Sequence, residues 1–270
     1  MVGNQIALKT EQLTLMIESV VSFIDNYFSQ DNIKKITKLF VFSNCTNLRF
    51  TYNDQLQILN HLKSYTSKAI FLPAYTYNSR SQIPFKVEQQ PSAQNGSMSR
   101  VVFENNLHCG NRTKDEDYSY FIINQDALAL EQVKKLNIWK KKSFGKDSHH
   151  SNLFLSDAIF FCLGNGLKDG FTPTMHLEAI VGVPYRQYQP FKSMMHLERT
   201  KLYYARKEKE FDNFGKGTRE KLLPYIQELD RNNFSFLELS QKSTSYFFTL
   251  KSFMTAGLHK LTSDPTFFIR

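Results

Sequence analysis

The chain has 270 residues, 41% of them hydrophobic and 22% charged, a balance that supports a folded core and excludes an intrinsically disordered protein. Its three cysteines are far apart, which excludes a disulfide framework and a paired-cysteine zinc site and favours a reducing, cytoplasmic location. The formal net charge of +9 favours an anionic ligand over nucleic acid, because no helix-turn-helix, zinc-finger or RNP signature accompanies it.

The first part of the chain alternates helix and strand patterns. Apolar residues recur at helical spacing over residues 9–28 and predict an amphipathic helix: Leu13, Ile17, Val20, Ile24 and Phe28. Residues 38–42 then read as a short buried strand, 53–66 as a second helix and 69–73 as a second buried strand. Helix, strand, helix, strand at this spacing predicts a parallel α/β core. Glu18 interrupts the apolar run of the first helix, so we expect neither a signal peptide nor a membrane span.

The second part is less regular. Residues 78–118 are polar and rich in turn signals, which predicts an excursion or lid. Residues 120–123 and 158–163 read as two further central strands, the second running into Gly164-Asn165-Gly166. Helices are expected over 216–230 and 245–261.

The expected fold class is therefore α/β. The elements predict a three-layer α/β/α arrangement with a mostly parallel central sheet and an additional C-terminal α+β part. We expect residues 1–270 to form one domain, with a looser part from 190 to 270.

Four short motifs occur in a fixed order: Val41-Phe42-Ser43-Asn44, Leu72-Pro73-Ala74-Tyr75-Thr76-Tyr77-Asn78, Phe144-Gly145-Lys146-Asp147-Ser148, and His176-Leu177-Glu178 followed by Val183-Pro184-Tyr185-Arg186. In order and spacing they resemble the aminoglycoside 3-N-acetyltransferase family, over roughly residues 10–190. The resemblance implies an α/β/α sheet protein that binds an acyl-CoA and acylates the amine of a sugar.

The resemblance also implies residues that bind the acyl-CoA: Ser43, Asn44, Tyr75, Thr76, Tyr77 and Ser148. The two tyrosine rings and the threonine hydroxyl suit the acyl-CoA arm, since such pockets combine apolar walls with few polar groups. Aromatic packing in the core is the alternative for the tyrosines, and a helix cap is the alternative for Ser148.

The sequence departs from the family pattern at two places. Where that family has an Arg-Ser-x-His-Pro block, this chain has Arg112-Thr113-Lys114-Asp115-Glu116, so Asp115 stands at the expected histidine. A register fixed on Glu178 places Met175 at a second expected histidine. Asp115 becomes a candidate for substrate binding, and a catalytically inactive CoA-binding homologue stays an alternative.

The expected chemistry needs a proton acceptor, because an amine attacks a thioester only as the free base. An imidazole has a suitable pKa, so His176 is the candidate general base, with Glu178 as a carboxylate that fixes its tautomer. Residues two apart share a face on an extended chain but not on a helix. Thr172-Pro173 predicts the start of a helix, in which case Glu178 orients another group. His149 and His150 lie in a polar segment, where a solvated loop is expected.

The charge bears on the acceptor. Aminoglycosides are polycations, whereas a nucleotide-linked amino-deoxysugar is an anion that the lysines at 140–142 and Arg186 would attract. We therefore expect such a sugar, in surface polysaccharide biosynthesis, with aminoglycoside acetylation as the alternative, since Asp115-Glu116-Asp117 would suit a cationic drug. The partners expected are the amino sugar and the acyl-CoA, with no metal, nucleic acid or membrane; a homo-oligomer stays open.

Overall fold

The computed structural model describes residues 2–30, 38–45, 47–65, 69–78, 83–123, 131, 134–135, 138–155, 157–167, 171–193, 198–204 and 219–269. Its strands are β1 (Lys38–Asn44), β2 (Ala69–Pro73), β3 (Tyr120–Ile123), β4 (Ala158–Gly164), β5 (Arg186–Lys192), β6 (Glu198–Tyr204), β7 (Ser235–Ser240) and β8 (Ser243–Thr249). Its helices are α1 (Val2–Phe28), α2 (Tyr52–Tyr65), α4 (Ser97–Glu104), α6 (His149–Leu153), α7 (Pro173–Val181), α8 (Leu223–Leu229) and α9 (Leu250–Ser263), with short 3-10 turns at Ala93–Asn95 and Glu220–Leu222.

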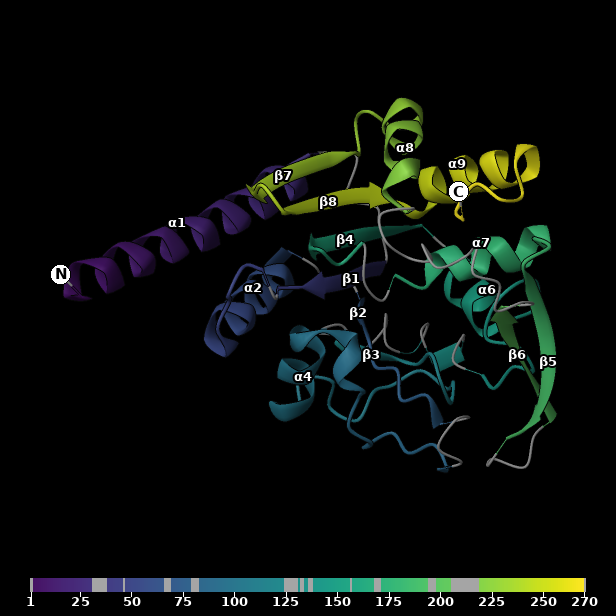
Figure 1. The fold of residues 1–270 in the computed structure, drawn as a ribbon. Helices are drawn as coiled ribbons and strands as arrows, with labels where there is room; N and C mark the ends of the chain where they lie inside the picture. The colour runs from purple at the N-terminus through teal and green to yellow at the C-terminus, as the bar shows by residue number, and fades with distance from the viewer. Residues whose placement is uncertain are drawn as a thin grey trace.

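Six strands form one sheet in the order β3-β2-β1-β4-β8-β7, and β5 and β6 form a separate hairpin (Figure 1). β1 pairs in parallel with β2 and β4. The pairs β2–β3, β4–β8 and β7–β8 are antiparallel, so the sheet is mixed and the expectation of a mostly parallel sheet is wrong. A two-residue turn joins β7 to β8, and such a turn can join only antiparallel strands.

The β7–β8 hairpin also corrects the predicted C-terminal elements. A helix was expected from 245, but residues 243–249 are strand β8 and helix α9 begins at Leu250. The inward positions at the start of β8 are Ser243 and Ser245, so the two-residue period does not appear as an alternation of apolar and polar residues. This part of the chain belongs to the main sheet. The helix expected over 216–230 is α8 with the turn before it, and residues 216–218 lie outside the described residues.

β3 is an edge strand and not the central strand that its apolar sequence predicted. All four of its residues are buried, because the preceding segment covers its outer edge. The Ile122 amide donates to the Asn111 carbonyl at 3.0 Å, and the Thr113 amide donates to the Tyr120 carbonyl at 2.9 Å. A covered edge needs no charge or proline to prevent pairing with another chain.

Helices pack on both faces of the sheet, as the side-chain alternation of β1 shows. Phe40 and Phe42 lie in one apolar cluster, which includes residues of α6, α7, α8 and α9: Leu153, Leu177, Ile226 and Phe253. Leu39 and Val41 lie in the other, which includes residues of α1, α2 and α4: Val20, Ile24, Ile58, Leu59, Val101 and Val102. The predicted excursion over 78–118 therefore contains a helix that contributes to the core.

Arg112 holds that excursion to the end of β2. Its guanidinium group lies over the rings of Phe85 and Phe121, 5.2 Å from each centroid. It donates hydrogen bonds to the backbone carbonyls of Ala74 and Gln89. A buried guanidinium group with several donors in a rigid fork can join chain segments in this way, whereas a lysine cannot.

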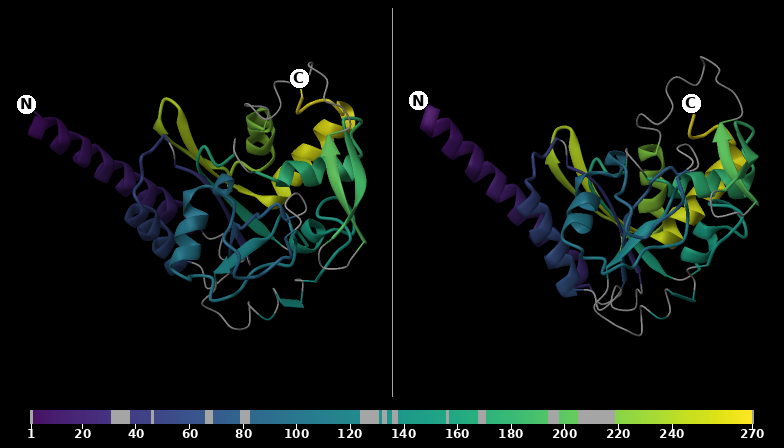
Figure 2. Two further views of the ribbon diagram at one scale, coloured as in Figure 1. Left: turned by 60° about the horizontal axis from the view of Figure 1, so that its bottom comes forward. Right: turned by 90° about the horizontal axis from the view of Figure 1, so that it is seen from below.

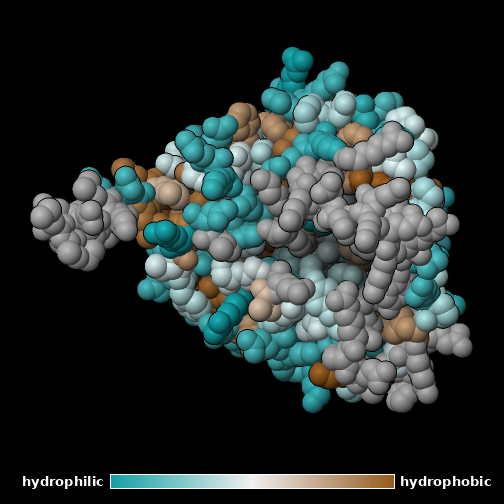
Figure 3. Space-filling model, in the orientation of Figure 1, coloured by the Kyte–Doolittle hydropathy of each residue, from teal (hydrophilic) through white to brown (hydrophobic). Residues whose placement is uncertain are grey.

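α1 is longer than predicted, and only its C-terminal part packs on the body. The Tyr27 ring stacks on Phe247 with centroids 4.1 Å apart, and Asp25 pairs with His61 of α2 at 2.6 Å. The N-terminal part extends away from the rest of the molecule in every view (Figures 1 and 2), and apolar side chains gather where it leaves the body, with Leu15 57% exposed (Figure 3). Within the described chain, neither this helix nor any other is long and apolar enough to cross a membrane.

Lys38 begins β1 with a buried ammonium group, which yields a stability prediction. Its Nζ donates to the Leu153 carbonyl at 2.7 Å, and burial lowers the pKa of Lys38 from 10.5 to about 8. Between these two pKa values the unfolded form of Lys38 binds more protons than the folded form, so Lys38 by itself makes the free energy of unfolding rise as the pH rises from about 8 to about 10.5. Buried groups with raised pKa values, such as the Cys45 thiol, act in the opposite direction, so the effect of Lys38 is the difference between the wild type and Lys38→Met. The variant should lack the contribution of Lys38 and should raise the free energy of unfolding at neutral pH by about 1–3 kcal/mol.

Urea unfolding at a series of pH values measures both effects. Lys251→Met, at an exposed position on α9, is the matched control and should leave the pH dependence unchanged. A Lys38→Met protein that is less stable at neutral pH and has the same pH dependence as the wild type from about pH 8 to about pH 10.5 would contradict the prediction.

Candidate functional site

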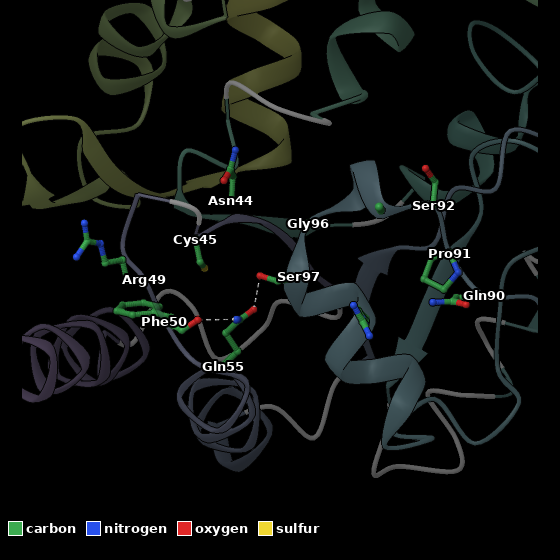
Figure 4. Close-up of a pocket in the computed structure, with 12 residues that line it drawn as sticks. Asn44, Cys45, Arg49, Phe50, Gln55, Gln90, Pro91, Ser92, Gly96 and Ser97 are labelled. Atoms are coloured by element: carbon green, nitrogen blue, oxygen red, sulfur yellow. Dashed lines mark hydrogen bonds between the residues drawn. The ribbon is translucent and has the colours of Figure 1, made fainter. Parts of the chain in front are cut away.

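A cavity of about 520 Å³ opens at the carboxyl end of β1, within the size range of small-molecule sites (Figure 4). In open α/β sheets, ligands bind at the carboxyl ends of parallel strands, which is where this cavity lies. It is lined by residues from the end of β1, the loop after it, α2, the segment after β2 and the start of α4: Asn44, Cys45, Arg49, Phe50, Gln55, Gln90, Pro91, Ser92, Ala93, Gly96, Ser97 and Arg100.

α4 begins at the wall of this cavity. Gly96 has a φ of +87° and lies so close to the Ser43 carbonyl that a Cβ atom would overlap it, so glycine is needed there. Gly96 is also the N-cap residue of α4 and has no side chain with which to cap the first amide groups of the helix. The Ser97 hydroxyl instead donates to Gln55 Oε1 at 2.7 Å, and Gln55 Nε2 donates to the Phe50 carbonyl at 3.1 Å (Figure 4). These bonds hold α2 and α4 together across the cavity.

The cavity is basic. The described residues that line it include Arg49 and Arg100 but no aspartate or glutamate. Arg100 forms an ion pair with Glu104, with the arginine Nε 2.6 Å from Oε1. Arg49 is exposed in the loop after β1. The positive end of a helix dipole and two guanidinium groups favour an anionic ligand.

A network of buried hydroxyl and imidazole groups lies beside the cavity. The Tyr75 hydroxyl is 2.7 Å from Thr172 Oγ1 and donates to the Tyr120 hydroxyl at 3.1 Å. The Tyr120 hydroxyl is 3.0 Å from His150 Nε2, and His150 Nδ1 is 2.8 Å from the Ser143 carbonyl. Because a carbonyl only accepts, Nδ1 carries the ring proton and Nε2 accepts from Tyr120. Burial and two nearby histidines lower the pKa of His150, so its ring is neutral.

Tyr75 connects the network with the cavity. Its carbonyl accepts hydrogen bonds from the Ser92 amide and from Asn95 Nδ2, both at 2.8 Å. Ser92 lines the cavity, so Tyr75 joins the cavity wall through its backbone and the buried network through its hydroxyl.

Of the residues predicted to bind the acyl-CoA, Asn44 lines the cavity and Ser43 lies directly beneath it, against Gly96. The Thr76 hydroxyl donates to the Glu116 carbonyl at 2.7 Å, and Tyr77 packs edge-on against Tyr118. Both residues thus make contacts within the protein.

Ser148 is fully buried and caps a helix. It precedes α6, its Oγ accepts from the Ser151 amide at 3.0 Å, and the Ser151 hydroxyl accepts from the Ser148 amide at 2.8 Å. This reciprocal pair is a capping box, which is the alternative that the sequence left open. The expectation that His149 and His150 lie in a solvated loop is wrong, since both rings are fully buried.

His176 and Glu178 both lie on α7, as Thr172-Pro173 predicted, and they point to different partners. The Gly145 amide donates to His176 Nδ1 at 3.2 Å. Glu178 accepts from the Tyr185 hydroxyl at 3.0 Å and from Arg186 at 2.8 Å. Burial raises the pKa of Glu178, and Arg186 opposes the shift. Glu178 therefore orients Arg186 and Tyr185.

The two side chains predicted to bind the substrate, Arg186 and Asp115, are buried and bond to other groups of the protein. The Arg186 and Glu178 side chains are only 7% and 5% exposed, so the Arg186 charge is neutralised locally. Asp115 is fully buried, and its carboxylate accepts from the amides of Asp117 and Tyr118 and, at 2.8 Å, from the Ser143 hydroxyl. As placed, neither group faces the cavity.

The β5–β6 hairpin packs over the loop that carries Gly145. The Tyr188 hydroxyl donates to the Phe144 carbonyl at 2.8 Å, and the Thr200 amide donates to the Lys141 carbonyl at 2.9 Å. Lys142 Nζ lies 4.8 Å from the centroid of the Tyr188 ring.

Several of these residues escaped sequence reasoning. Arg49, Gln55 and Ser97 lie outside the motifs, and only the position of Arg49, shortly after a buried strand, would have marked it. Tyr120 was assigned to a strand without a polar role. Within the described residues, no three of His, Cys, Asp or Glu come together as metal ligands.

The buried pair of Arg186 and Glu178 yields a second stability prediction. Arg186→Met leaves a buried carboxylate without its cation and should lower the free energy of unfolding by about 3–5 kcal/mol. Adding Glu178→Gln to that variant should recover part of the loss, because it removes the uncompensated charge. Urea unfolding measures the free energy of unfolding of the single and the double variant. Equal values for the two would show that the loss in Arg186→Met does not come from an uncompensated charge on Glu178.

Neither a protein family model nor a curated protein matches the sequence. Solved structures do match. Aminoglycoside acetyltransferase AAC(3)-IIb is 14% identical with a TM-score of 0.66, covering 92% of this chain and 97% of that chain. Aminoglycoside acetyltransferase AAC(3)-IVa is 12% identical with a TM-score of 0.64, covering 93% of this chain and 90% of that chain. AAC-IIIb in binary complex with CoASH is 11% identical with a TM-score of 0.58, covering 89% of this chain and 96% of that chain. The chain therefore has the fold of the aminoglycoside acetyltransferases, in agreement with the resemblance of its sequence motifs.

Proposed function

We propose that the chain is an acyl-CoA-dependent N-acyltransferase and works as one domain. One observation carries the proposal: a fold shared over about nine-tenths of both chains with acetyltransferases, one of them in complex with CoASH. The basic cavity at the end of β1 supports it, since it adjoins two sequence motifs that resemble the same enzymes.

The acyl-CoA is the anionic ligand that this cavity would take. Its phosphates would lie near Arg49, Arg100 and the start of α4, whose N-cap residue is a glycine, because cationic groups and a helix dipole favour negative charge there. Asn44, which lines the cavity, and Ser43 and Tyr75, which lie behind its wall, are the further binding residues that we propose. A site of about 520 Å³ can hold part of so long a ligand.

The acceptor that we propose is an amino-deoxysugar linked to a nucleotide, used in surface polysaccharide synthesis. The net charge of +9 supports an anionic acceptor. Asp115, Glu116 and Asp117 are buried, which removes the acidic surface that a polycationic drug would need there. Acylation of an aminoglycoside is the second candidate, favoured by the names of the structural neighbours.

A thiol-release assay tests the reaction. Purified protein with acetyl-CoA should release free CoA thiol only when a suitable amine is added, and nucleotide-linked amino-deoxysugars should outperform aminoglycosides. Hydroxyacyl-CoA donors form a second series. Turnover with aminoglycosides alone would contradict the proposal that the acceptor is a nucleotide-linked sugar. CoA binding without any turnover would indicate an inactive homologue.

Arg49 provides a sharper test of where the donor binds. Arg49→Ala should raise the KM for acyl-CoA about five- to tenfold with little change in kcat, because it removes a charge from the binding site alone. Arg231→Ala removes an exposed arginine outside the cavity and is the matched control. Equal KM values in the two variants would place the phosphates elsewhere.

A further inference from the structure

The ring of His176 is held by a backbone amide in an orientation that glycine makes possible. Gly145 has a φ of +83°, and a Cβ atom at this position would overlap the Tyr188 hydroxyl, so another residue would be strained and would clash. In this conformation the Gly145 amide donates to His176 Nδ1 at 3.2 Å. The Phe144-Gly145 pair of the third sequence motif therefore has a physical role: it presents one N–H group to the histidine.

This bond determines which nitrogen of His176 carries the proton. A nitrogen that accepts a hydrogen bond from an amide has its lone pair directed at that amide, so the proton of the neutral ring is on Nε2. Nε2 is then a donor and not an acceptor. To take up a second proton, the ring must lose the Gly145 bond.

The surroundings of His176 favour the neutral ring. The residue lies in the first turn of α7, where the helix dipole disfavours a cation, and it is 2% exposed. Burial lowers the pKa of His176 to about 4. Among the described residues, the titratable group that faces the ring is His150, whose ring centroid is 6.1 Å away and which is itself neutral.

We propose that His176 acts in acyl transfer as a neutral hydrogen-bond donor, whose Nε2–H binds the carbonyl oxygen of the acyl group, and not as the base that removes the proton of the amine. This role rests on the proposed function. A donor directed at the oxygen that gains negative charge lowers the barrier without any proton transfer from the ring.

The step balances without a proton on His176 moving. The lone pair of the amine attacks the thioester carbonyl carbon, and the oxygen gains negative charge against Nε2–H. The carbonyl re-forms as the C–S bond breaks, and that electron pair stays on the CoA sulfur. The proton lost by the nitrogen passes to the thiolate or to water, which leaves an amide and the CoA thiol.

Nitrogen NMR of the imidazole rings tests the tautomer without any turnover. With ¹⁵N-histidine-labelled protein, His176 should show a protonated Nε2 and an unprotonated Nδ1 from about pH 5 to about pH 9, with no titration near 6.5. His176→Gln identifies its signals. A ring that titrates near 6.5, or that carries its proton on Nδ1, overturns the proposal.

Two ligands then test the contact. One is CoA; the other is a CoA thioether that ends in a methyl ketone, which has the carbonyl oxygen but no bond to cleave. The ketone should move the His176 Nε2–H signal downfield and CoA should not. If the ketone binds without this shift, the proposal is wrong and the proposed function stands; if neither ligand binds, the proposed function is wrong and this role with it.

Kinetics separate a donor from a base. His176→Ala should lower kcat about 100-fold, whereas His176→Gln, which keeps an N–H donor, should retain about ten times the kcat of the alanine variant. The pH dependence of kcat in His176→Gln should follow that of the wild type. Loss, in that variant, of an acid-side inflection that the wild type shows would identify His176 as the base and overturn the proposal.

Discussion

Polar groups that are buried must find partners, and this requirement fixes the centre of the molecule. Tyr75, Tyr120, Thr172 and His150 come from the end of β2, from β3, from the start of α7 and from α6, and each bonds to another of the four. A buried hydroxyl or imidazole without a hydrogen-bond partner costs several kcal/mol. This is a large fraction of the net free energy of unfolding of a domain, which is about 5–15 kcal/mol. The bonds therefore fix the positions of these four elements relative to one another. Because the Tyr75 carbonyl also accepts from the Ser92 amide, they fix the wall of the cavity as well.

The sequence predicted elements whose apolar residues repeat with a clear period. β1, β2, β4 and α2 were located within a few residues, because their patterns report burial directly. It missed β8, where serines occupy inward positions, and it misplaced β3, whose outer edge is covered by the segment just before it. Which strand lies beside which depends on pairing between residues far apart in the chain, and a local pattern does not contain this information.

The site was predicted less completely, for a related reason. Asn44 was identified from a motif and lines the cavity, and Tyr75, from another motif, bonds to Ser92 of its wall. The partner of a polar side chain, however, depends on what folding brings next to it. Asp115 and Arg186 have the residue types of a substrate site and are occupied by internal bonds. His149 and His150 look like surface residues in the sequence and are fully buried. A helix for residues 173–181 was enough to predict that His176 and Glu178 diverge.

The β5–β6 hairpin has a consequence for how the molecule fluctuates. It is a separate two-stranded sheet, and its described links to the rest of the protein include the bonds of Tyr188 and Thr200 to the loop at 141–145 and the buried pair of Arg186 with Glu178. Parts of a domain outside its main sheet can open without unfolding of the whole, but an opening of this hairpin must separate a buried ion pair, which costs several kcal/mol. Exchange of the β5 amide protons with solvent therefore reports how often Arg186 leaves Glu178.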